Sequence, residues 1–386
     1  MKLGKLCILF TDGDWIESKD QSDSGIRLIQ TGNIGNGEFL YKNDKAKYIS
    51  VDTFKRLNCK EVFPNDILVS RLPEPVGRGC IIPDIGEKMI TAVDCTICRI
   101  NENLVDRKYF CYFLESNAYK TQLEQHVTGT TRKRISRKNL SSVEIDIPEQ
   151  AKQKEVVYKL DRLKKIIQNY NRELDLLDEL VRARFVEMFG DLRVNDKGWK
   201  YYKLDELTEL ITDGEHATPK RTTQGIYLLS ARNVLNHQLS LEDVDYIDYD
   251  EFSRISRRII PREGDVLISC SGSIGRCCVV PKNIKFQMVR SIALLRFKSN
   301  INPVFAEYMI TSDYLQDQIN KSKTASSQAN LFQGKIKSLK GVVPPLELQN
   351  QFASFVQEID KSRSRIQKSL EASQELFDSL MQEYFG

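Results

Sequence analysis

The two halves of this chain carry the same sequence landmarks, offset by about 200 residues. The Thr-Asp-Gly tripeptide at 11–13 returns at 212–214, and the run Asp-Ile-Leu-Val-Ser at 66–70 returns as Asp-Val-Leu-Ile-Ser at 265–269. Further matches are Gly25-Ile26 with Gly225-Ile226, Asn33 with Asn233, Gly77-Arg78 with Gly275-Arg276, and the Phe-Gly pairs at 189–190 and 385–386. Solenoid repeats have periods of about 20–50 residues, so a period this long indicates a duplicated domain.

Each copy begins with a mixed globular part, 1–148 in the first copy and 191–344 in the second. Short β-rich runs occur at 67–69, 266–268, 278–280 and 292–297, and clusters of Gly, Pro, Asn and Asp separate them. Helical patterns lie between the runs, at 106–124 and 303–321. Because strands and helices do not alternate as regular βαβ units, the pattern predicts an α+β fold with two tandem α/β domains.

A long segment without Pro or Gly closes each copy, at 149–189 and at 346–385, and proline precedes both. Apolar residues in the first segment recur at alternating steps of four and three, the heptad pattern of a coiled coil: Val156, Leu160, Leu163, Ile167, Tyr170, Leu174 and Leu177. The seam of the second segment is less regular and comprises Phe352, Phe355, Ile359, Ile366, Leu370 and Phe377.

Neither helix can bury such a seam alone, and the chain supplies one partner for each. We therefore expect the helical spacers 149–190 and 345–386 to form an antiparallel intramolecular coiled coil. These helices would separate the domains 1–148 and 191–344 and relate them by a pseudo-twofold axis. The alternative is two separate helices, each packed on its own domain.

The nine cysteines are scattered without a disulfide framework, which favours a reducing cytoplasm. Cys95 and Cys98 have metal-like spacing, but no second pair or nearby histidine completes a zinc site, so we expect buried free thiols. No apolar run approaches 18 residues, and the apolar patch after Met1 is too short for a signal peptide, so no membrane association is expected.

Sequence signatures of catalysis are missing. The chain has no phosphate-binding G-x-x-x-x-G-K-[ST] loop, no strand-linked G-x-G-x-x-G, and no Asn/Asp-Pro-Pro-Tyr/Phe run. Asp14, Glu17 and Lys19 only faintly resemble a nuclease metal site, and the three histidines lack ligand spacing. We therefore expect a non-catalytic chain without a bound cofactor or metal.

Basic residues gather at equivalent places in the two copies. The stretches 125–143 and 318–346 contain five Lys or Arg each and no acid, although the net charge is only +4. A basic stretch is commonly a solvated surface, but its recurrence favours a phosphate-facing patch in each domain. The loops 129–134, 271–276 and 324–330 add small polar residues that let a backbone approach phosphate, and amide and guanidinium groups that can address base edges.

The candidate DNA contacts lie in these loops and around the repeated turns. In the first copy they are Trp15, Lys19, Thr31, Asn33, Arg71, Arg78, Thr130, Thr131, Arg132, Lys133 and Arg134. In the second copy they are His216, Lys220, Arg221, Arg232, Asn233, Ser271, Ser273, Arg276, Ser326, Ser327, Gln328 and Asn330. Asn33 and Asn233 are equally compatible with a role in a turn.

Several landmarks together resemble the DNA-specificity subunits of type I restriction–modification systems. They are the doubled Thr-Asp-Gly turn, Gly129-Thr-Thr-Arg with Ile135-Ser136, the run Pro-Pro-Leu-Glu-Leu-Gln at 344–349, Lys159-Leu160-Asp161 and the Phe-Gly ends. The resemblance covers essentially the whole chain. Two departures are the shortened motif at 148–150 and the different loop at 324–330.

The resemblance implies two target-recognition domains, each recognising one half of a bipartite, asymmetric site in double-stranded DNA. The helices would set the gap and dock methyltransferase subunits, two in number, which restriction motor-nuclease subunits would join. S-adenosylmethionine, Mg²⁺ and ATP are expected on those partner subunits, and the complex in the cytoplasm. Two rival functions are an enzyme with unrecognised motifs and a coiled-coil adaptor that binds only protein.

Overall fold

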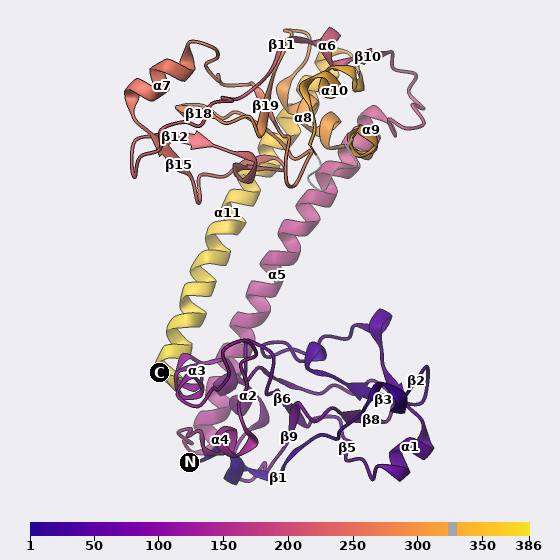
Figure 1. The fold of residues 1–386 in the computed structure, drawn as a ribbon, viewed down its shortest axis with the longest axis vertical. Coiled ribbons are helices and arrows are strands. Elements are labelled where there is room, and N and C mark those ends of the chain that lie inside the picture. The colour runs from indigo at the N-terminus through magenta and orange to yellow at the C-terminus, as the bar shows by residue number, and fades with distance from the viewer. Residues whose placement is uncertain (323–329) are drawn as a thin grey trace. The chain divides into compact units, whose positions relative to one another are not determined.

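The computed structural model describes residues 1–322 and 330–386 (Figure 1). It divides into two compact units, unit 1 with Met1–Arg172 and Gln367–Gly386, and unit 2 with Glu173–Ile366. In the described part of the chain, no helix combines the length and the hydropathy needed to cross a membrane. Unit 1 and unit 2 thus each contain one globular part and portions of both long helices.

Unit 1 is built on two sheets. The first is antiparallel, in the order β1-β9-β6-β7, and comprises β1 (Cys7–Asp12), β9 (Cys95–Ile100), β6 (Ile67–Ser70) and β7 (Gly79–Ile81). The second has the order β2-β4-β3-β8-β5 and comprises β2 (Gln21–Ser22), β4 (Tyr48–Ile49), β3 (Ile26–Ile29), β8 (Met89–Thr91) and β5 (Glu61–Val62). Strands β3 and β8 are parallel, and the other pairs are antiparallel.

Short helices cover and connect these sheets. They are the 3-10 turns η1 (Leu3–Leu6), η2 (Ser18–Asp20), η3 (Thr31–Asn33) and η4 (Asn43–Lys45), and the α-helices α1 (Val51–Arg56), α2 (Arg107–Glu115), α3 (Asn117–Glu124) and α4 (Arg137–Ser142). Asp106 accepts hydrogen bonds from the first-turn amides of α2, and Ser116 and Ser136 cap α3 and α4 in the same way. The cap at Ser116 divides the predicted helix 106–124 into two.

Unit 2 repeats this plan. Its antiparallel sheet has the order β11-β19-β16-β17, and smaller sheets have the orders β15-β12-β18, β13-β14 and β10-β20. The strands are β10 (Tyr201–Lys203), β11 (Thr208–Asp213), β12 (Ile226–Leu229), β13 (Val234–Leu235), β14 (Gln238–Leu239), β15 (Asp245–Ile247), β16 (Val266–Ser269), β17 (Cys277–Val279), β18 (Phe286–Met288), β19 (Ile292–Phe297) and β20 (Lys340–Val342). The helices are α6 (Leu204–Leu207), η5 (Ala231–Asn233), α7 (Tyr249–Ser256), α8 (Pro303–Thr311), α9 (Asp313–Ser322) and α10 (Gln333–Ser338).

The duplication extends to strand register. Strand β1 pairs with β9, and β11 with β19, and each pairing has a bulge after its first residue. Asp66 forms a two-pronged ion pair with Arg99 at 2.8 Å, and Asp265 forms the same pair with Arg296 at 2.8 and 2.7 Å. Since both aspartates are buried, each pair ties the start of one central strand to its neighbour. Each domain therefore has the same framework.

The predicted helices are present as α5 (Gln150–Phe189) and α11 (Leu346–Phe385). A fully buried glutamine in the first turn anchors each of them. Gln153 accepts from the amide of Asp106 at 2.7 Å and donates to the carbonyl of Pro148, while Gln349 makes the same two contacts with Asn302 and Pro344. Each helix is thus fixed at its start to the globular part that precedes it.

The ends of the helices complete the core of the other copy. In unit 1, Phe385 at the end of α11 packs against Tyr109 and Phe113. The end of α11 lies beside α2 and α3 (Figure 1). In unit 2, Phe189 at the end of α5 packs against Phe305 and Phe352 with ring centroids 4.7 and 5.5 Å apart. The core of each unit therefore contains the start of one long helix and the end of the other.

Within unit 2 the two helices run antiparallel, as predicted. Phe185 contacts Phe352, and further along Asp178 pairs with Arg363 at 2.7 Å. The predicted seam residues Val156, Leu160 and Phe352 are buried in the domain cores, whereas the other ten are half-buried. The sequence pattern did not predict two positions of the seam, the buried Val356 and the charged Arg363. Arg363 forms an ion pair with Asp178 of the other helix, in the interval between Ile359 and Ile366 where the heptad pattern has no apolar residue. The alternative in which each helix packs only on its own domain is wrong.

The reciprocal cores predict a crossed pattern of destabilisation. Phe385→Ala should speed amide hydrogen exchange in α2 (Arg107–Glu115) of unit 1. Phe189→Ala should speed it in α8 (Pro303–Thr311) of unit 2. In each case the removed ring should lower the local stability by about 3 kcal/mol. Hydrogen-exchange mass spectrometry of the full chain measures both. Exchange that rises instead in the globular part preceding the mutated helix would contradict this packing.

Candidate DNA-recognition surfaces

The repeated Thr-Asp-Gly tripeptides form a tight backbone junction at the end of β1 and of β11. The amides of Gly13 and Asp14 donate to the carbonyls of Cys95 and Thr91, and those of Gly214 and Glu215 to Ile292 and Met288. A Cβ atom would lie 2.3 Å from the carbonyl oxygen of Thr91 at Gly13, and 2.3 Å from that of Met288 at Gly214. Only glycine fits at these junctions, which fix the chain as it enters the segments of Trp15 and His216.

The aspartate of each tripeptide is neutralised by an arginine. Asp12 accepts from Thr96 at 2.9 Å and lies 3.2 Å from Arg71, and Asp213 pairs with Arg258 at 2.8 Å. Arg71 also donates to the carbonyls of Val93 and Ile135, so it ties the basic loop to the sheet. The guanidinium of Arg71 is therefore largely engaged within the protein, and its role as a DNA contact stays a prediction.

In unit 1, the segment after the junction presents an aromatic ring and a cation to solvent. Trp15 is 70% exposed, and Lys19 pairs with Glu17 at 2.8 Å while its side chain stays 74% exposed. Buried Asp20 accepts from the amide of Glu17 and from Arg56, at 3.3 and 2.5 Å, which holds this segment against α1. Trp15 and Lys19 are thus carried on a fixed segment.

In unit 2, a different anchor holds the equivalent segment. The carboxylate of Glu251 on α7 accepts from the amide of Lys220 at 3.2 Å and from Arg254 at two distances of 2.9 Å. The hydrogen bonds of Arg254 lower the pKa of Glu251 to about 2. The side chain of Lys220 is exposed, and His216 lies 2.9 Å from Asp213. Sequence reasoning missed Glu251, Arg254 and Arg258, since no motif links them to the turn.

Arg221 and Arg232 lie beside acids of the same surface. Arg221 pairs with Asp245 at 3.0 Å, and Arg232 lies 3.3 Å from Asp245 and 3.6 Å from Asp243. Both arginine side chains are 46% exposed. The structure therefore brings these two candidate residues together in one ion-pair cluster. A DNA phosphate would have to compete with the two aspartates for the arginines.

Asn33 and Asn233 are turn residues. Asn33 is 7% exposed; its side-chain oxygen accepts from the amide of Gln30 and its side-chain NH₂ donates to the carbonyl of Leu40. Asn233 is fully buried and makes the same two kinds of bond, to Ser230 and Ser240. Both amides are used inside the protein, as the turn alternative expects, and the prediction that they address base edges stays a prediction.

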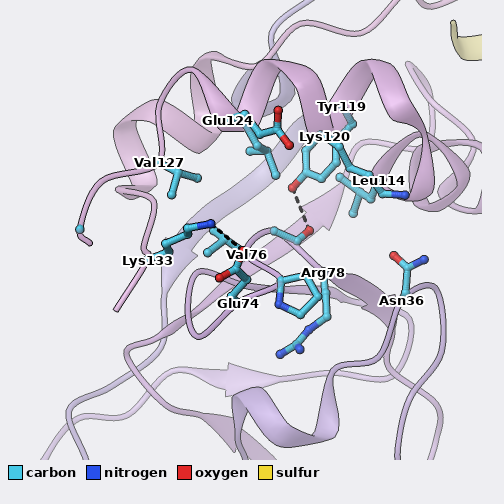
Figure 2. Close-up of a pocket in the computed structure, with 14 residues that line it drawn as sticks. Asn36, Glu74, Val76, Arg78, Leu114, Tyr119, Lys120, Glu124, Val127 and Lys133 are labelled. Carbon is cyan, nitrogen blue, oxygen red and sulfur yellow. Dashed lines mark hydrogen bonds and ion pairs between the residues drawn. The ribbon is translucent and has the colours of Figure 1, made fainter. Parts of the chain in front are cut away.

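The basic loop of unit 1 is a small hairpin. Thr128 and Arg134 exchange two backbone hydrogen bonds of 2.9 Å, and Gly129 at φ +97° makes the turn. Thr130, Thr131 and Arg132 are exposed at its tip, and Arg134 is exposed at its base. Lys133 is also exposed, but it pairs with Glu74 at 2.7 Å. Figure 2 shows this ion pair at the edge of a cavity of about 640 Å³, which Arg78 also lines.

The remaining candidates lie near the equivalent loop of unit 2. The amide of Leu331 donates to the carbonyl of Cys270, just as that of Ile135 donates to Arg71, and Ser271 bridges to Asn330. Ser273 is exposed and Arg276 half-buried, like Arg78, whose guanidinium donates to the carbonyl of Thr31 at 3.4 Å. The predicted contacts Ser326, Ser327 and Gln328 lie outside the described residues.

Neither metal hypothesis finds support. All nine cysteines are free thiols, and burial raises the pKa of Cys95 to about 12 and that of Cys98 well above its usual value. Asp14 accepts from the amide of Lys60 at 2.6 Å, and Glu17 pairs with Lys19. In residues 1–322 and 330–386, no group of three or more His, Cys, Asp or Glu could hold a metal ion.

Comparison with known proteins decides the family. Residues 1–178 and 196–374 match the family described as the type I restriction modification DNA specificity domain. The chain belongs to this family. The two matched segments correspond to the two copies of the repeat, so the chain carries two such specificity domains. As a specificity chain it is not the catalytic component of its system, and the predicted fold class is confirmed.

Individual relatives agree, although their sequences have diverged. The chain is 20% identical over 370 residues to the type I restriction enzyme EcoKI specificity subunit of Escherichia coli K12, covering 90% of this chain and 78% of that subunit. It is 21% identical to the EcoBI specificity subunit of E. coli, covering 71% of this chain and 63% of that subunit.

Solved structures show the same fold. The type I restriction–modification S subunit from M. genitalium aligns with a TM-score of 0.58 at 14% identity, covering all of this chain and 95% of that one. A chain from a structure described as concerning complex assembly and conformational transition of the type I R-M system aligns with a TM-score of 0.60 at 13% identity, covering all of this chain and 96% of that one.

The anchor of Lys220 predicts a pH-dependent stability. A carboxylate whose folded pKa is lowered stabilises the fold above its ordinary pKa and loses that contribution as the pH falls through the folded value. Glu251→Gln should lower the free energy of unfolding by about 1–2 kcal/mol at pH 7. Solvent weakens the ion pair, because Arg254 is 45% exposed, and this expected loss takes that into account. The difference in unfolding free energy between parent and variant should shrink as the pH falls below 4.5 toward 2. Urea unfolding across this pH range measures it. The matched control is Glu179→Gln, an exposed glutamate of α5 for which the described residues offer no ion pair; an equal pH dependence in both variants would contradict the anchor.

Proposed function

We propose that each unit recognises one half of a bipartite DNA site through the segment that follows its Thr-Asp-Gly junction and through its neighbouring loop. The observation that carries the proposal is a shared framework with different surfaces. The glycine junction, the buried asparagine turn and the aspartate–arginine pair between strands recur in both units. The exposed residues mounted on them differ, so the two half-sites should differ.

The surface chemistry supports a division of labour. Exposed Arg132 and Arg134 offer charge to phosphates without regard to sequence, whereas Lys19 and Lys220 sit on anchored segments that a base edge could meet in a defined geometry. Trp15 adds a flat apolar face beside Lys19. Thr31, Arg78, Thr130, Thr131, Ser273 and Arg276 remain candidates for further contacts.

We further propose a division of the chain into recognition domains 1–148 and 191–344 and helical spacers 149–190 and 345–386. The spacers would set the distance between the half-sites and dock two methyltransferase subunits. Restriction motor-nuclease subunits would complete the complex, with S-adenosylmethionine, Mg²⁺ and ATP bound on those partners, in the cytoplasm. Membership of the specificity family and the reciprocal anchoring of the helices support this arrangement.

Substitution of Lys19 and of Lys220 tests the proposal. Lys19→Ser should change or relax one half of the methylated motif, and Lys220→Ser the other half, because each cation lies on the segment of one unit. Sequencing of methylation marks in cells that express each variant with the methyltransferase subunits measures this. The control is Arg193→Ser, an exposed arginine paired with Asp191 after α5, which should leave the motif intact. Motifs unchanged by both lysine variants would exclude these residues as readers, and methylation without any sequence preference would favour a protein-binding adaptor.

A further inference from the structure

A second basic cavity lies in unit 1, beside the Thr-Asp-Gly junction and the basic hairpin. It is an open hollow with a volume of about 640 Å³, lined by Lys2, η1, the end of β1 and α4. Four of its lining side chains are cationic, Lys2, Lys5, Arg137 and Lys138, and one is acidic, Asp12. The cations therefore come from two ends of the domain sequence that the fold brings together.

The framework around this cavity is fixed. The amide of Leu3 donates to the carbonyl of Val143 at 2.9 Å, and Leu3 and Leu6 are buried, so Lys2 and Lys5 are left on the outer side of η1. Gly4 packs closely on α4, because a Cβ atom there would lie 2.9 Å from the Cβ atom of Ser141. This close approach of η1 to α4 is what gathers the two pairs of cations.

The positive charge of the cavity is not compensated from within. Asp12 already accepts from Thr96 and pairs with Arg71, and Arg137 lies farther from it, at 3.9 Å. Lys2, Lys5 and Lys138 are exposed and have no ion-pair partner in the part of the chain that the structure describes. Four cations therefore face one carboxylate that is already neutralised, an arrangement that attracts an anion.

Unit 2 carries a smaller net positive charge at the equivalent place, because two acids accompany its lysines. Its α10 has Gln333 and Gly334 where α4 has Arg137 and Lys138, and its α6 has Asp205 and Glu206 where η1 has Gly4 and Lys5. Lys337 of α10 is paired with Asp205 at 3.7 Å. Among the described residues, the basic stretch of unit 1 therefore builds an open cationic cavity beside α4, whereas Asp205 and Glu206 offset the lysines of unit 2.

We propose that this cavity binds phosphodiester groups of the DNA backbone and that unit 1 therefore carries more of the phosphate contacts than unit 2. The proposal rests on the proposed DNA-binding function. DNA is the occupant because Ser136, the cap of α4, lies two residues after Arg134 of the exposed hairpin, so the cavity continues a cationic surface along the chain. Lysine ammonium groups address phosphate as point charges, so the contact supplies affinity and orientation without base specificity.

The test is a double variant, Lys2→Gln with Lys138→Gln, in the full chain assembled with its methyltransferase subunits. Each phosphate contact contributes about 0.9 to the slope of log affinity against log salt, so loss of two should weaken the dependence by about 1.8. Between 50 and 200 mM salt, the parent should lose about tenfold more affinity than the variant, for the preferred duplex and an unrelated duplex alike. The matched control, Lys203→Gln with Lys337→Gln at the equivalent place in unit 2, should keep the parental slope.

Three outcomes separate the possibilities. An unchanged slope in the Lys2 and Lys138 variant, with a melting temperature equal to that of the parent, overturns the proposal. A second outcome is that inorganic phosphate competes with DNA only when these lysines are present, while the slope of log affinity against log salt is the same in parent and variant. That result would indicate a site for a free anion and would also overturn the proposal. A parent complex without preference between the two duplexes would contradict the proposed function instead, and the slope comparison would still decide whether the cavity contacts phosphate.

Discussion

The fold depends on the burial of each long helix end in a core that the other half of the chain begins. Phe385 closes the core around Tyr109 and Phe113, and Phe189 closes the core around Phe305 and Phe352. Large aromatic side chains dominate the energetics of such cores, so neither globular part is complete without the helix that arrives from the other copy. The duplicated chain is therefore not two independent repeats in series, because the last helical turns of each repeat are buried in the core of the other repeat.

This arrangement leaves the recognition surfaces free to diverge. The turns that carry them are fixed by backbone hydrogen bonds and glycine junctions, which involve no exposed side chain. On that common framework, unit 1 holds its segment with Asp20 and Arg56, whereas unit 2 uses Glu251 and Arg254. Different anchors set different cations at the surface, which is a physical route from one ancestral domain to two distinct half-sites.

Much of this was predictable from local patterns. Proline boundaries and the heptad repeat gave both long helices to within a residue or two, and the apolar runs placed the central strands. The sequence does not distinguish polar residues that are exposed from those that are bonded within the protein. Arg71 and Asn33 look like DNA contacts in the sequence, but each is bonded to backbone carbonyl groups far along the chain or across a turn. Such partners are set by tertiary packing, which spacing in the sequence does not reveal, and for the same reason Arg258 and Glu251 went unrecognised.

The central claim is that the half-sites belong to the two domains and the gap between them to the helices. Insertion of seven residues into both helices, between Leu163 and Leu177 of α5 and between Arg363 and Phe377 of α11, leaves every buried helix end in place. Methylation sequencing of cells that express this chain with its methyltransferase subunits should then show both half-sites unchanged and a longer unspecified spacer. A changed half-site, or a spacer that keeps its length, would contradict the account.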